Sequence, residues 1–297
     1  MRTLSVTVTP ELDGRMVKGI LRGELLLSYT LLKSLKWREN AILLNGRSVH
    51  VNAIVHTGDV VSVNLTERSG APSALPCPMA LDIVYEDDDL LVLNKPAGIA
   101  MHPKSTDLSA PSMASALTAY LGTGSVAHFV SRLDKGTSGL FLAAKTGYVH
   151  DRLRRALHSD ALRREYRAVA VGTVTPPCGV IEAPIGRADG SLVKRCVRSD
   201  GLPSLTEYQT LEVCSGFTLL RLVPHTGRTH QLRVHLAHLG YPLAGDWLYG
   251  TEDLSLIARP ALHSCKLMFM HPITGKALHF TAPLPEDMAK LIKKSDG

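Results

Sequence analysis

The segment His128–Thr146, HFVSRLDKGTSGLFLAAKT, indicates most about how this chain folds. Asp134 lies in a polar loop, and the apolar run Leu140–Ala144 that follows it has the length and composition of a buried strand. A short loop that leads into a buried strand is a rigid place to hold a carboxylate. The hydroxyls of Thr137 and Ser138 can hydrogen-bond the loop backbone and fix its shape. From these residues alone, a functional carboxylate and an ordinary aspartate-containing turn are equally good interpretations.

The segments around this stretch predict an α+β fold with a mixed, mainly antiparallel sheet. Two apolar runs, 81–85 and 90–95, flank the acidic turn Glu86–Asp89 and predict a hairpin. Strands and helices follow one another without the regular alternation of βαβ units, which argues against a doubly wound sheet. Further strands are expected at 139–146, 166–174, 217–224 and 277–283, and helices at 112–121, 149–160 and 229–240.

A change in composition at 67–78, ERSGAPSALPCP, divides the chain into two parts. Three prolines, a glycine and two serines between apolar-periodic segments are typical of a linker. We therefore expect a small N-terminal domain at 1–66, a linker at 67–78 and a larger domain at 79–297.

The N-terminal part is predicted to be a small α+β module with a basic helix. In SYTLLKSLKW, residues 28–37, leucines recur at helical spacing and Ser28 can cap the first turn. Lys33 and Lys36 fall elsewhere on this helix. The dipeptide Asn45-Gly46 lies between two β-prone runs and predicts a hairpin, because both residues tolerate positive φ.

A third strand is expected directly after this hairpin, in VVSVNL at 60–65. A basic helix followed by a small sheet with an Asn-Gly turn resembles the αL RNA-binding domain, first seen in a small-subunit ribosomal protein. The resemblance covers residues 15–65. The alternative is a small module whose lysines simply face water.

The bulk composition is that of an ordinary globular protein with a basic excess. The 297 residues are 45% hydrophobic and 20% charged, and the formal net charge is +6. This excess is compatible with a polyanionic partner and equally with a basic surface that binds nothing. Five single cysteines without C-x-x-C spacing indicate reduced thiols and no zinc ribbon. No apolar segment is long enough for a signal peptide or a membrane span, so we expect a soluble, cytoplasmic protein without a membrane partner. We also expect a monomer.

The segment 222–240, LVPHTGRTHQLRVHLAHLG, holds four histidines and two arginines but no acidic residue. Arg228 follows a Thr-Gly turn at an expected helix start, where free backbone N–H groups and the helix dipole attract anions. Arg233 is placed one turn further along. A metal-dependent hydrolase built on the histidines is the alternative, but no carboxylate is near and the spacing lacks the H-E-x-x-H form. The four histidines are His225, His230, His235 and His238.

Four motifs, in this order, resemble those of the RluA-like pseudouridine synthases. They are KPAG at 95–98, RLDKGTSGL at 132–140, REYRAVAVG at 164–172 and HTGRTHQLRVHLAHLGYPLAGDWLYG at 225–250. The resemblance implies the pseudouridine synthase fold for the larger domain, and an enzyme that isomerises specific uridines in structured RNA to pseudouridine. Members with an appended N-terminal module commonly act on large-subunit ribosomal RNA, which is therefore the expected partner. Transfer RNA and a catalytically silent RNA-binding or chaperone protein are the alternatives.

The resemblance also implies roles for individual residues. The aspartate of the family motif is the catalytic nucleophile, which maps onto Asp134. The family's active-site tyrosine, which stacks on the target base and takes part in proton transfer, maps onto Tyr166; a lone strand tyrosine is otherwise most often just half-buried. The arginine that pairs with the aspartate maps onto Arg233, and a carboxylate beside a fixed guanidinium stays ionised, as a nucleophile requires. One departure is Ser131, where the family has a histidine.

Further residues of these motifs are expected to bind the substrate and the RNA backbone. The target uridine must leave its stack, and Arg132 is a candidate for holding the displaced strand. The expected substrate-binding residues are Arg132, Thr137, Ser138, Arg228, His230 and Gln231. The basic segment 151–167 is expected to bind phosphates together with the N-terminal lysines. The expected RNA-binding residues are Lys33, Lys36, Arg152, Arg155, Arg163 and Arg164. The sequence lacks a Walker loop or dinucleotide fingerprint, and the chemistry needs no redox step, so neither cofactor nor metal is expected.

Overall fold

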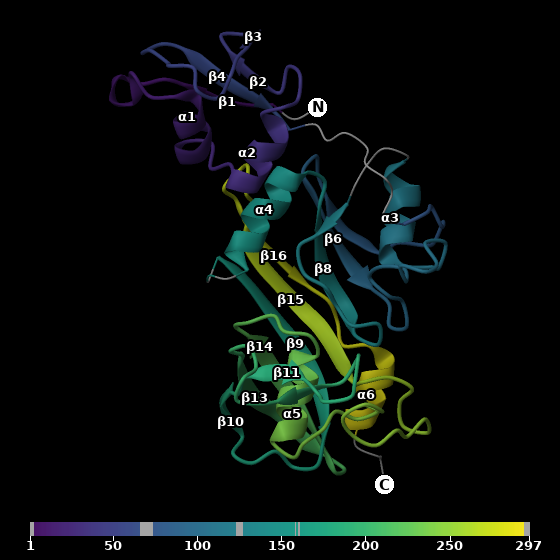
Figure 1. Cartoon of the computed structure of the whole chain (residues 1–297). Coiled ribbons are helices and arrows are strands. Elements are labelled where there is room, and N and C mark those ends of the chain that lie inside the picture. Colours follow the sequence, from purple (N-terminus) through teal and green to yellow (C-terminus); the bar gives the residue numbers. More distant parts are fainter. Residues whose placement is uncertain (1–2, 66–73, 123–126, 158, 160, 294–297) are drawn as a thin grey trace.

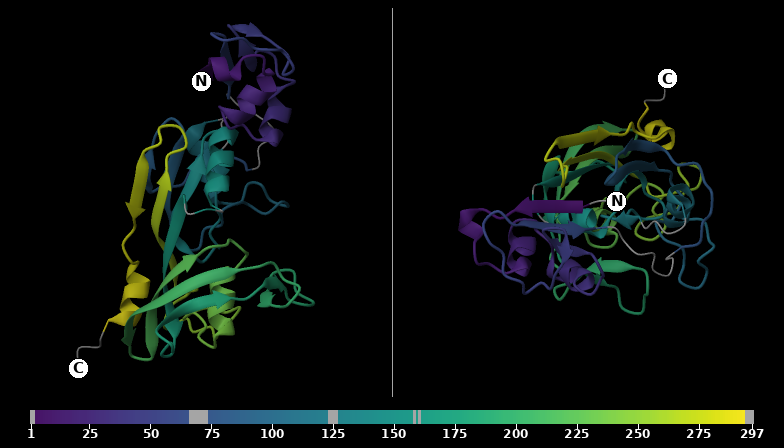
Figure 2. Two further views of the ribbon diagram at one scale, coloured as in Figure 1. Left: turned by 90° about the vertical axis from the view of Figure 1, so that its left-hand side faces the viewer. Right: turned by 90° about the horizontal axis from the view of Figure 1, so that it is seen from above.

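The chain extends along one long axis, with a small N-terminal module at one end and the C-terminal helix at the other (Figure 1). The computed structural model describes residues 3–65, 74–122, 127–157, 159 and 161–293. The left view of Figure 2 shows the same order of parts from the side, with the N-terminal module and the C-terminal helix at opposite ends. Within the described residues, none of the helices has the length and apolar character needed to cross a membrane.

The main body is built on a ten-stranded, mostly antiparallel sheet, which confirms the α+β prediction. The strand order is β10-β13-β14-β9-β15-β8-β6-β5, with β16 beside β15 and β7 beside β8. Among the strand pairs of the described residues, β8 and β15 alone run parallel. The bounds are β5 Ile83–Glu86, β6 Leu90–Lys95, β7 His128–Phe129, β8 Ser138–Ala144, β9 Leu162–Val171, β10 Cys178–Glu182, β13 Leu205–Cys214, β14 Phe217–Pro224, β15 Leu262–Met270 and β16 Ala277–Thr281.

Strand β8 is central because both of its faces are covered. All seven of its residues are buried, and a strand that is covered on both sides has a continuous apolar sequence. Its even-numbered residues 140, 142 and 144 pack in one apolar cluster, with α4 (Gly147–Ala156) and the N-terminal module. Phe141 and Ala143 pack in the other, with α3 (Met113–Leu121). The loop that holds Asp134 therefore leads into the most firmly packed strand of the protein.

The N-terminal module agrees with the prediction and adds two elements to it. Helix α2 (Tyr29–Leu35) is capped by Ser28, whose hydroxyl accepts a hydrogen bond from the Leu31 amide at 3.2 Å. Asn45 and Gly46 turn with φ of 52° and 78° between two strands, as expected. Strand β1 and helix α1 were not predicted, since β1 pairs only with the distant β4. The module comprises β1 Thr3–Thr7, a 3-10 turn Pro10–Leu12, α1 Val17–Gly23, α2, β2 Ile42–Leu44, β3 Arg47–Ser48 and β4 Val60–Asn64.

The predicted linker is described only in its second half, because residues 67–73 lie outside the described residues. From position 74 the chain packs onto the larger domain: the Leu75 amide donates to the Leu108 carbonyl at 2.9 Å, and the Cys77 amide donates to the Ser115 carbonyl at 3.1 Å. Residues 74–78 are therefore hydrogen-bonded to the main body of the protein and do not form a free linker.

The boundary between α4 and β9 differs from the prediction. Tyr166 was expected to begin a strand, but β9 begins four residues earlier, at Leu162, and runs in register beside β15. Charged side chains at 163–165 obscured this start, because their strand character comes from pairing with the distant β15. The basic segment 151–167 is therefore part helix and part strand. Two smaller helices complete the fold, α5 (Gln231–His238) and α6 (Glu286–Ile292), with a two-strand ribbon of β11 (Ile185–Arg187) and β12 (Arg195–Val197).

Candidate active site

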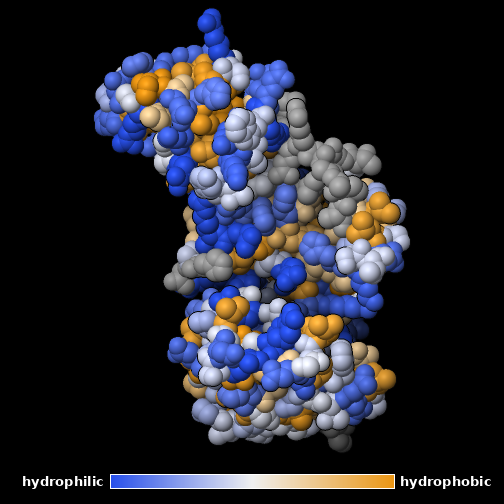
Figure 3. Space-filling model, in the orientation of Figure 1, coloured by the Kyte–Doolittle hydropathy of each residue, from blue (hydrophilic) through white to orange (hydrophobic). Residues whose placement is uncertain are grey.

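A cavity of about 740 Å³ lies where the loop before β8, helix α4, strand β9 and the start of α5 meet. Figure 3 shows hydrophilic side chains gathered at the waist between the middle and lower parts of the molecule. The expected catalytic residues Asp134, Tyr166 and Arg233 all line this cavity, although they are far apart in the sequence. The fold therefore brings together the three side chains on which the prediction of activity depends.

Asp134 sits on a loop whose backbone is fixed from two sides. The Thr137 amide donates to the Asp134 carbonyl at 3.1 Å and closes a turn. The next carbonyl, that of Lys135, accepts from the Gly98 amide at 2.9 Å and from the Lys95 ammonium at 3.1 Å. The Asp134 side chain itself is 30% exposed and faces the cavity. Its carboxylate is open to a ligand while its backbone is held.

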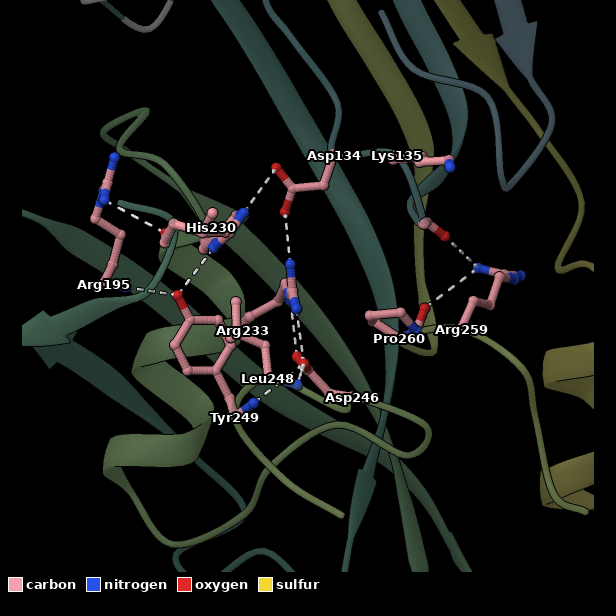
Figure 4. Close-up of polar contacts among 12 residues, drawn as sticks. Asp134, Lys135, Arg195, His230, Arg233, Asp246, Leu248, Tyr249, Arg259 and Pro260 are labelled. Atoms are coloured by element: carbon pink, nitrogen blue, oxygen red, sulfur yellow. Dashed lines mark hydrogen bonds and ion pairs between the residues drawn. The ribbon is translucent and has the colours of Figure 1, made fainter. Parts of the chain in front are cut away.

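Arg233 approaches Asp134 from helix α5 (Figure 4). Its Nη1 atom lies 3.5 Å from Asp134 Oδ2. Its other two nitrogens, Nε and Nη2, each donate to Asp246 at 2.7 Å, in the side-on arrangement that suits a guanidinium and a carboxylate. Burial alone would lower the pKa of Arg233, but the hydrogen bonds and charge of Asp246, with the charge of Asp134, outweigh burial and raise it. The guanidinium is thus a permanent, immobile cation beside Asp134.

His230 lies on the other side of the Asp134 carboxylate, with Nε2 at 3.9 Å from Oδ1. It has a left-handed backbone, φ 58°, directly before α5, which turns its ring toward Tyr249. The Nδ1 atom lies 2.9 Å from the Tyr249 hydroxyl oxygen, and that oxygen accepts the Arg195 amide at 2.9 Å. The tyrosine proton is then available for Nδ1, which assigns the ring proton to Nε2, facing Asp134. Burial lowers the pKa of His230 in spite of Asp134, so the ring is neutral at neutral pH.

Tyr166 lines the cavity from strand β9. It is 6% exposed and shares one face of β9 with Ala168 and Ala170, as the predicted alternation requires. Burial raises the pKa of Tyr166 above that of a free phenol, so the hydroxyl keeps its proton at neutral pH. Its ring can stack on a base and its hydroxyl can donate or accept a proton.

This chain is similar to RNA pseudouridine synthases in both sequence and fold. The sequence profile of the family described as RNA pseudouridylate synthase matches residues 89–238. The uncharacterized RNA pseudouridine synthase YjbO of Bacillus subtilis is 38% identical over 273 residues, which cover 91% of this chain and 96% of that protein. The chain belongs to the RNA pseudouridylate synthase family.

Two further relatives agree with this assignment. The ribosomal large subunit pseudouridine synthase D of Yersinia pestis is 37% identical over 306 residues, which cover 97% of this chain and 93% of that protein. The solved structure of human RNA pseudouridylate synthase domain containing 1 superposes with a TM-score of 0.56 at 28% identity, covering 72% of this chain and 85% of that one. This RluA-like pseudouridine synthase is therefore an isomerase that acts on RNA.

The expected substrate-binding residues of the synthase separate into two groups. Arg132, Thr137, Arg228, His230 and Gln231 line the cavity, as does Ser131 at the position of the family's histidine. Ser138 does not line it. Its hydroxyl lies 2.9 Å from Nδ1 of His263, the residue opposite it on the neighbouring strand β15. The structure therefore places Ser138 outside the cavity that the other expected substrate-binding residues line.

Gln231 borders the cavity but uses its amide inside the protein. Its Oε1 accepts from the Thr226 hydroxyl at 2.7 Å and from the Arg228 amide at 3.0 Å. Its Nε2 donates to the Leu205 carbonyl at 2.9 Å and to the Thr206 hydroxyl at 3.0 Å. Gln231 therefore ties the 226–228 loop to β13, and its contribution to the site is to shape that loop.

The expected RNA-binding residues are also only partly at the cavity. Arg164 lines it, whereas Arg152, Arg155 and Arg163 do not. Arg155 is occupied by Asp151 at 2.5 Å and by the Leu26 carbonyl at 3.4 Å. Lys33 and Lys36 are exposed on α2, with the Lys36 ammonium 4.7 Å from the centre of the Trp37 ring. Arg154 was not predicted individually, yet it lines the cavity together with His150 one turn earlier.

The four histidines of segment 222–240 do not converge on one point. His235 is buried and uses both ring nitrogens, at 2.9 Å from the Thr206 hydroxyl and 3.0 Å from the Ala183 carbonyl. Nε2 of His225 lies 2.8 Å from Glu207 Oε1, and Nδ1 of His230 is hydrogen-bonded to the Tyr249 hydroxyl. Among the described residues, metal-ligand spacing occurs only at Asp87, Asp89 and His271, which do not line the cavity. The arrangement gives no support to a histidine-based hydrolase.

Proposed function

We propose that Asp134 is the nucleophile of this synthase and that large-subunit ribosomal RNA is its substrate. The single observation that supports the nucleophile best is the position of Asp134. It is an accessible carboxylate, 3.5 Å from a buried guanidinium, at a cavity large enough for an extruded nucleotide. A fixed cation favours the ionised carboxylate, and only the ionised form is an effective nucleophile.

In the proposed reaction the target uridine leaves its stack and enters the cavity. Flipping costs a few kcal/mol, which stacking on Tyr166 and phosphate contacts offset. Asp134 then attacks the anomeric carbon or the uracil ring, or promotes a glycal route; all three are compatible with its position. The freed uracil rotates, carbon 5 bonds to the anomeric carbon, and the proton on carbon 5 leaves. The lining residues Arg154, Arg164 and Arg228 are suited to the phosphates that flank the target.

The decisive test of the nucleophile is Asp134→Asn, which preserves shape and removes the charge. Tritium release from RNA labelled at carbon 5 of uridine should be abolished, while filter binding of the same RNA should change less than about threefold, because the carboxylate adds nothing to phosphate binding. Near wild-type release by this variant would refute the assignment. Release by the wild type would also exclude a catalytically silent RNA chaperone.

The choice of RNA is supported by relatives alone. Several of them are named ribosomal large subunit pseudouridine synthase D, including that of Vibrio cholerae, 38% identical over 272 residues. Mapping pseudouridines in total RNA from a strain that lacks this protein tests the proposal directly. Loss of sites confined to transfer RNA would favour the second candidate substrate and contradict the first.

We further propose that residues 1–66 form an αL-type RNA-binding domain, joined through 67–78 to a catalytic domain at 79–297. The support is the exposed α2 surface with Lys33 and Lys36. Replacing both lysines with glutamine should lower the slope of log affinity against log salt by about one for each phosphate that is no longer neutralised. Lys18→Gln, on exposed α1, is the matched control. An unchanged slope in the double variant would argue against this surface as an RNA-binding site.

A further inference from the structure

A further buried cation, Arg259, contacts the loop that carries Asp134 and lies outside the four sequence motifs quoted above. Arg259 is 8% exposed and lies between the cavity loops and the C-terminal helix. Its Nη1 atom donates to the Gly136 carbonyl at 3.3 Å and to the Leu262 carbonyl at 3.1 Å. It also donates to the Pro260 carbonyl at 3.4 Å (Figure 4). Gly136 is two residues after Asp134, so this contact fixes the loop just beyond the point that Lys95 holds through Lys135.

The other end of the Arg259 guanidinium is bound by helix α6. Nε donates to Asp287 Oδ2 at 2.6 Å, and Nη2 donates to Asp287 Oδ1 at 2.8 Å. Burial raises the pKa of Asp287, but the hydrogen bonds and charge of Arg259 outweigh burial and lower it, so the pair is ionised at neutral pH. Such a two-point pair sets the orientation of the guanidinium as well as its position.

The loop also rests directly on this segment. A Cβ atom added to Gly136 would lie 2.9 Å from Cδ of Pro260, which is closer than such atoms approach in proteins. Gly136 therefore lies close against Pro260, and a side chain at this position would push the loop away from it. The Nη1 contact opposes such a displacement. The position of the loop is defined on this side by residues 259–260.

We propose that Arg259 is a positioning residue for Asp134, and that α6 holds it in place through Asp287. The inference rests on the proposed role of Asp134 as nucleophile. Both Arg259 and Asp287 lie outside the 89–238 segment that the family profile matches. The carboxylate of a nucleophilic Asp134 must be positioned to within a fraction of an ångström of the reacting nucleotide. A displacement of about 1 Å at a reacting group costs on the order of 100-fold in rate. The C-terminal helix is thereby part of the catalytic apparatus, though it does not line the cavity.

The test compares variants at both ends of this contact. Arg259→Met keeps an apolar stem and removes the donors, and Asp287→Asn keeps the donors but removes the ion pair that orients them. Single-turnover rates at saturating enzyme should fall about 30-fold in the first and about fivefold in the second, with the RNA Kd changed less than about twofold. Arg259→Lys should recover part of the loss, because an ammonium can still reach one carbonyl.

Two controls separate positioning from stability. Glu286→Gln makes the same charge change as Asp287→Asn one residue away, at an exposed site, and should leave the rate unchanged. Phe269→Leu removes buried volume from the far end of β15 and should lower the unfolding temperature without lowering the rate of the folded enzyme. If Arg259→Met does not fold, the single-turnover rate of Asp287→Asn, compared with that of Glu286→Gln, tests the proposal by itself.

A rate for Asp287→Asn equal to that for Glu286→Gln, or a loss in Arg259→Met no larger than in Phe269→Leu, would overturn the proposal. An effect confined to Kd would do the same. Asp134→Asn in the same assay separates this failure from failure of the proposed function. If that variant is inactive while Arg259→Met is fully active, the nucleophile stands and the positioning role falls. If Asp134→Asn is active, the nucleophile itself is wrong.

Discussion

Arg233 is shared unequally between Asp246 and Asp134. Both of its contacts to Asp246 are 2.7 Å long, whereas its contact to Asp134 is 3.5 Å. Asp246 is completely buried and Asp134 is partly exposed. The short pair fixes the guanidinium, and the longer contact leaves the lone pairs of Asp134 free for a substrate. A carboxylate bound at two points by Arg233 would be held more firmly but would be a poorer nucleophile.

Asp246→Asn should therefore destabilise the protein and slow it. Removing one partner of a buried ion pair leaves the other charge without compensation, which costs about 3–5 kcal/mol. We expect a loss of this size in urea unfolding, with a rate reduction of at least about tenfold in the folded enzyme, since Arg233 can then turn toward Asp134. Glu252→Gln, at an exposed position in the same segment, is the control and should change neither. A variant as stable and as fast as the wild type would show that Arg233 needs no second carboxylate.

Tyr249→Phe tests the contact chain from the Tyr249 hydroxyl through the His230 ring to Asp134. The substitution removes a hydroxyl that lies between His230 Nδ1 and the Arg195 amide and leaves the ring in place. His230 then loses the partner that fixes its tautomer, and we expect the single-turnover rate to fall about five- to tenfold with little change in RNA affinity. Tyr241→Phe is the matched control, because that hydroxyl accepts the Thr175 amide away from the site. Equal rates for the two variants would mean that His230 acts without Tyr249.

The lowered pKa of Lys95 leads us to predict a loss of activity at alkaline pH. Burial and the nearby charge of Arg259 lower the pKa of Lys95 to about 8, although Asp134 acts in the opposite direction. Below that pH the ammonium donates to the carbonyls of Pro96, Ile99 and Lys135. As the pH rises through about 8 the amine keeps two N–H groups for three acceptors, so the hold on the loop that carries Asp134 weakens.

The expected pH profile of the single-turnover rate thus has a descending limb centred near pH 8. Lys95→Met should be slow throughout and lack this limb, because it carries no proton to lose. Persistence of the limb in Lys95→Met would assign it to another group, and its absence in the wild type would show that Lys95 stays charged above that range.

The sequence motifs predicted the residues that meet at the cavity better than they predicted their partners. Asp134, Tyr166 and Arg233 line one cavity because each lies in or beside a strongly patterned strand or helix. Asp246 was within a quoted motif but was not singled out. A single acidic residue in a loop gives no sign that it will be buried against an arginine on a helix. The signal that could have found it was the need of a buried Arg233 for a compensating carboxylate.

Neighbouring residues of the predicted binding set differ in where the fold places them. Thr137 lines the cavity, whereas Ser138, the first residue of β8, places its hydroxyl 2.9 Å from His263 Nδ1. Along α4, the side that faces the cavity carries Arg154, whereas Arg155 turns toward the N-terminal module. A run of several arginines indicates a basic helix, but only packing against the rest of the protein selects the side that meets the substrate.

Arg154 provides the sharpest test of that selection. Arg154→Gln should weaken RNA binding and lower the slope of log affinity against log salt by about one, because one phosphate fewer is neutralised. Arg155→Gln removes the same charge from the next position, but Arg155 is already paired with Asp151 and bonded to Leu26. Its effect on the slope should be at most half as large. The measurement is filter binding of one RNA across a salt series. A larger effect for Arg155 than for Arg154 would mean that RNA follows the outer face of α4 and does not approach the cavity along it.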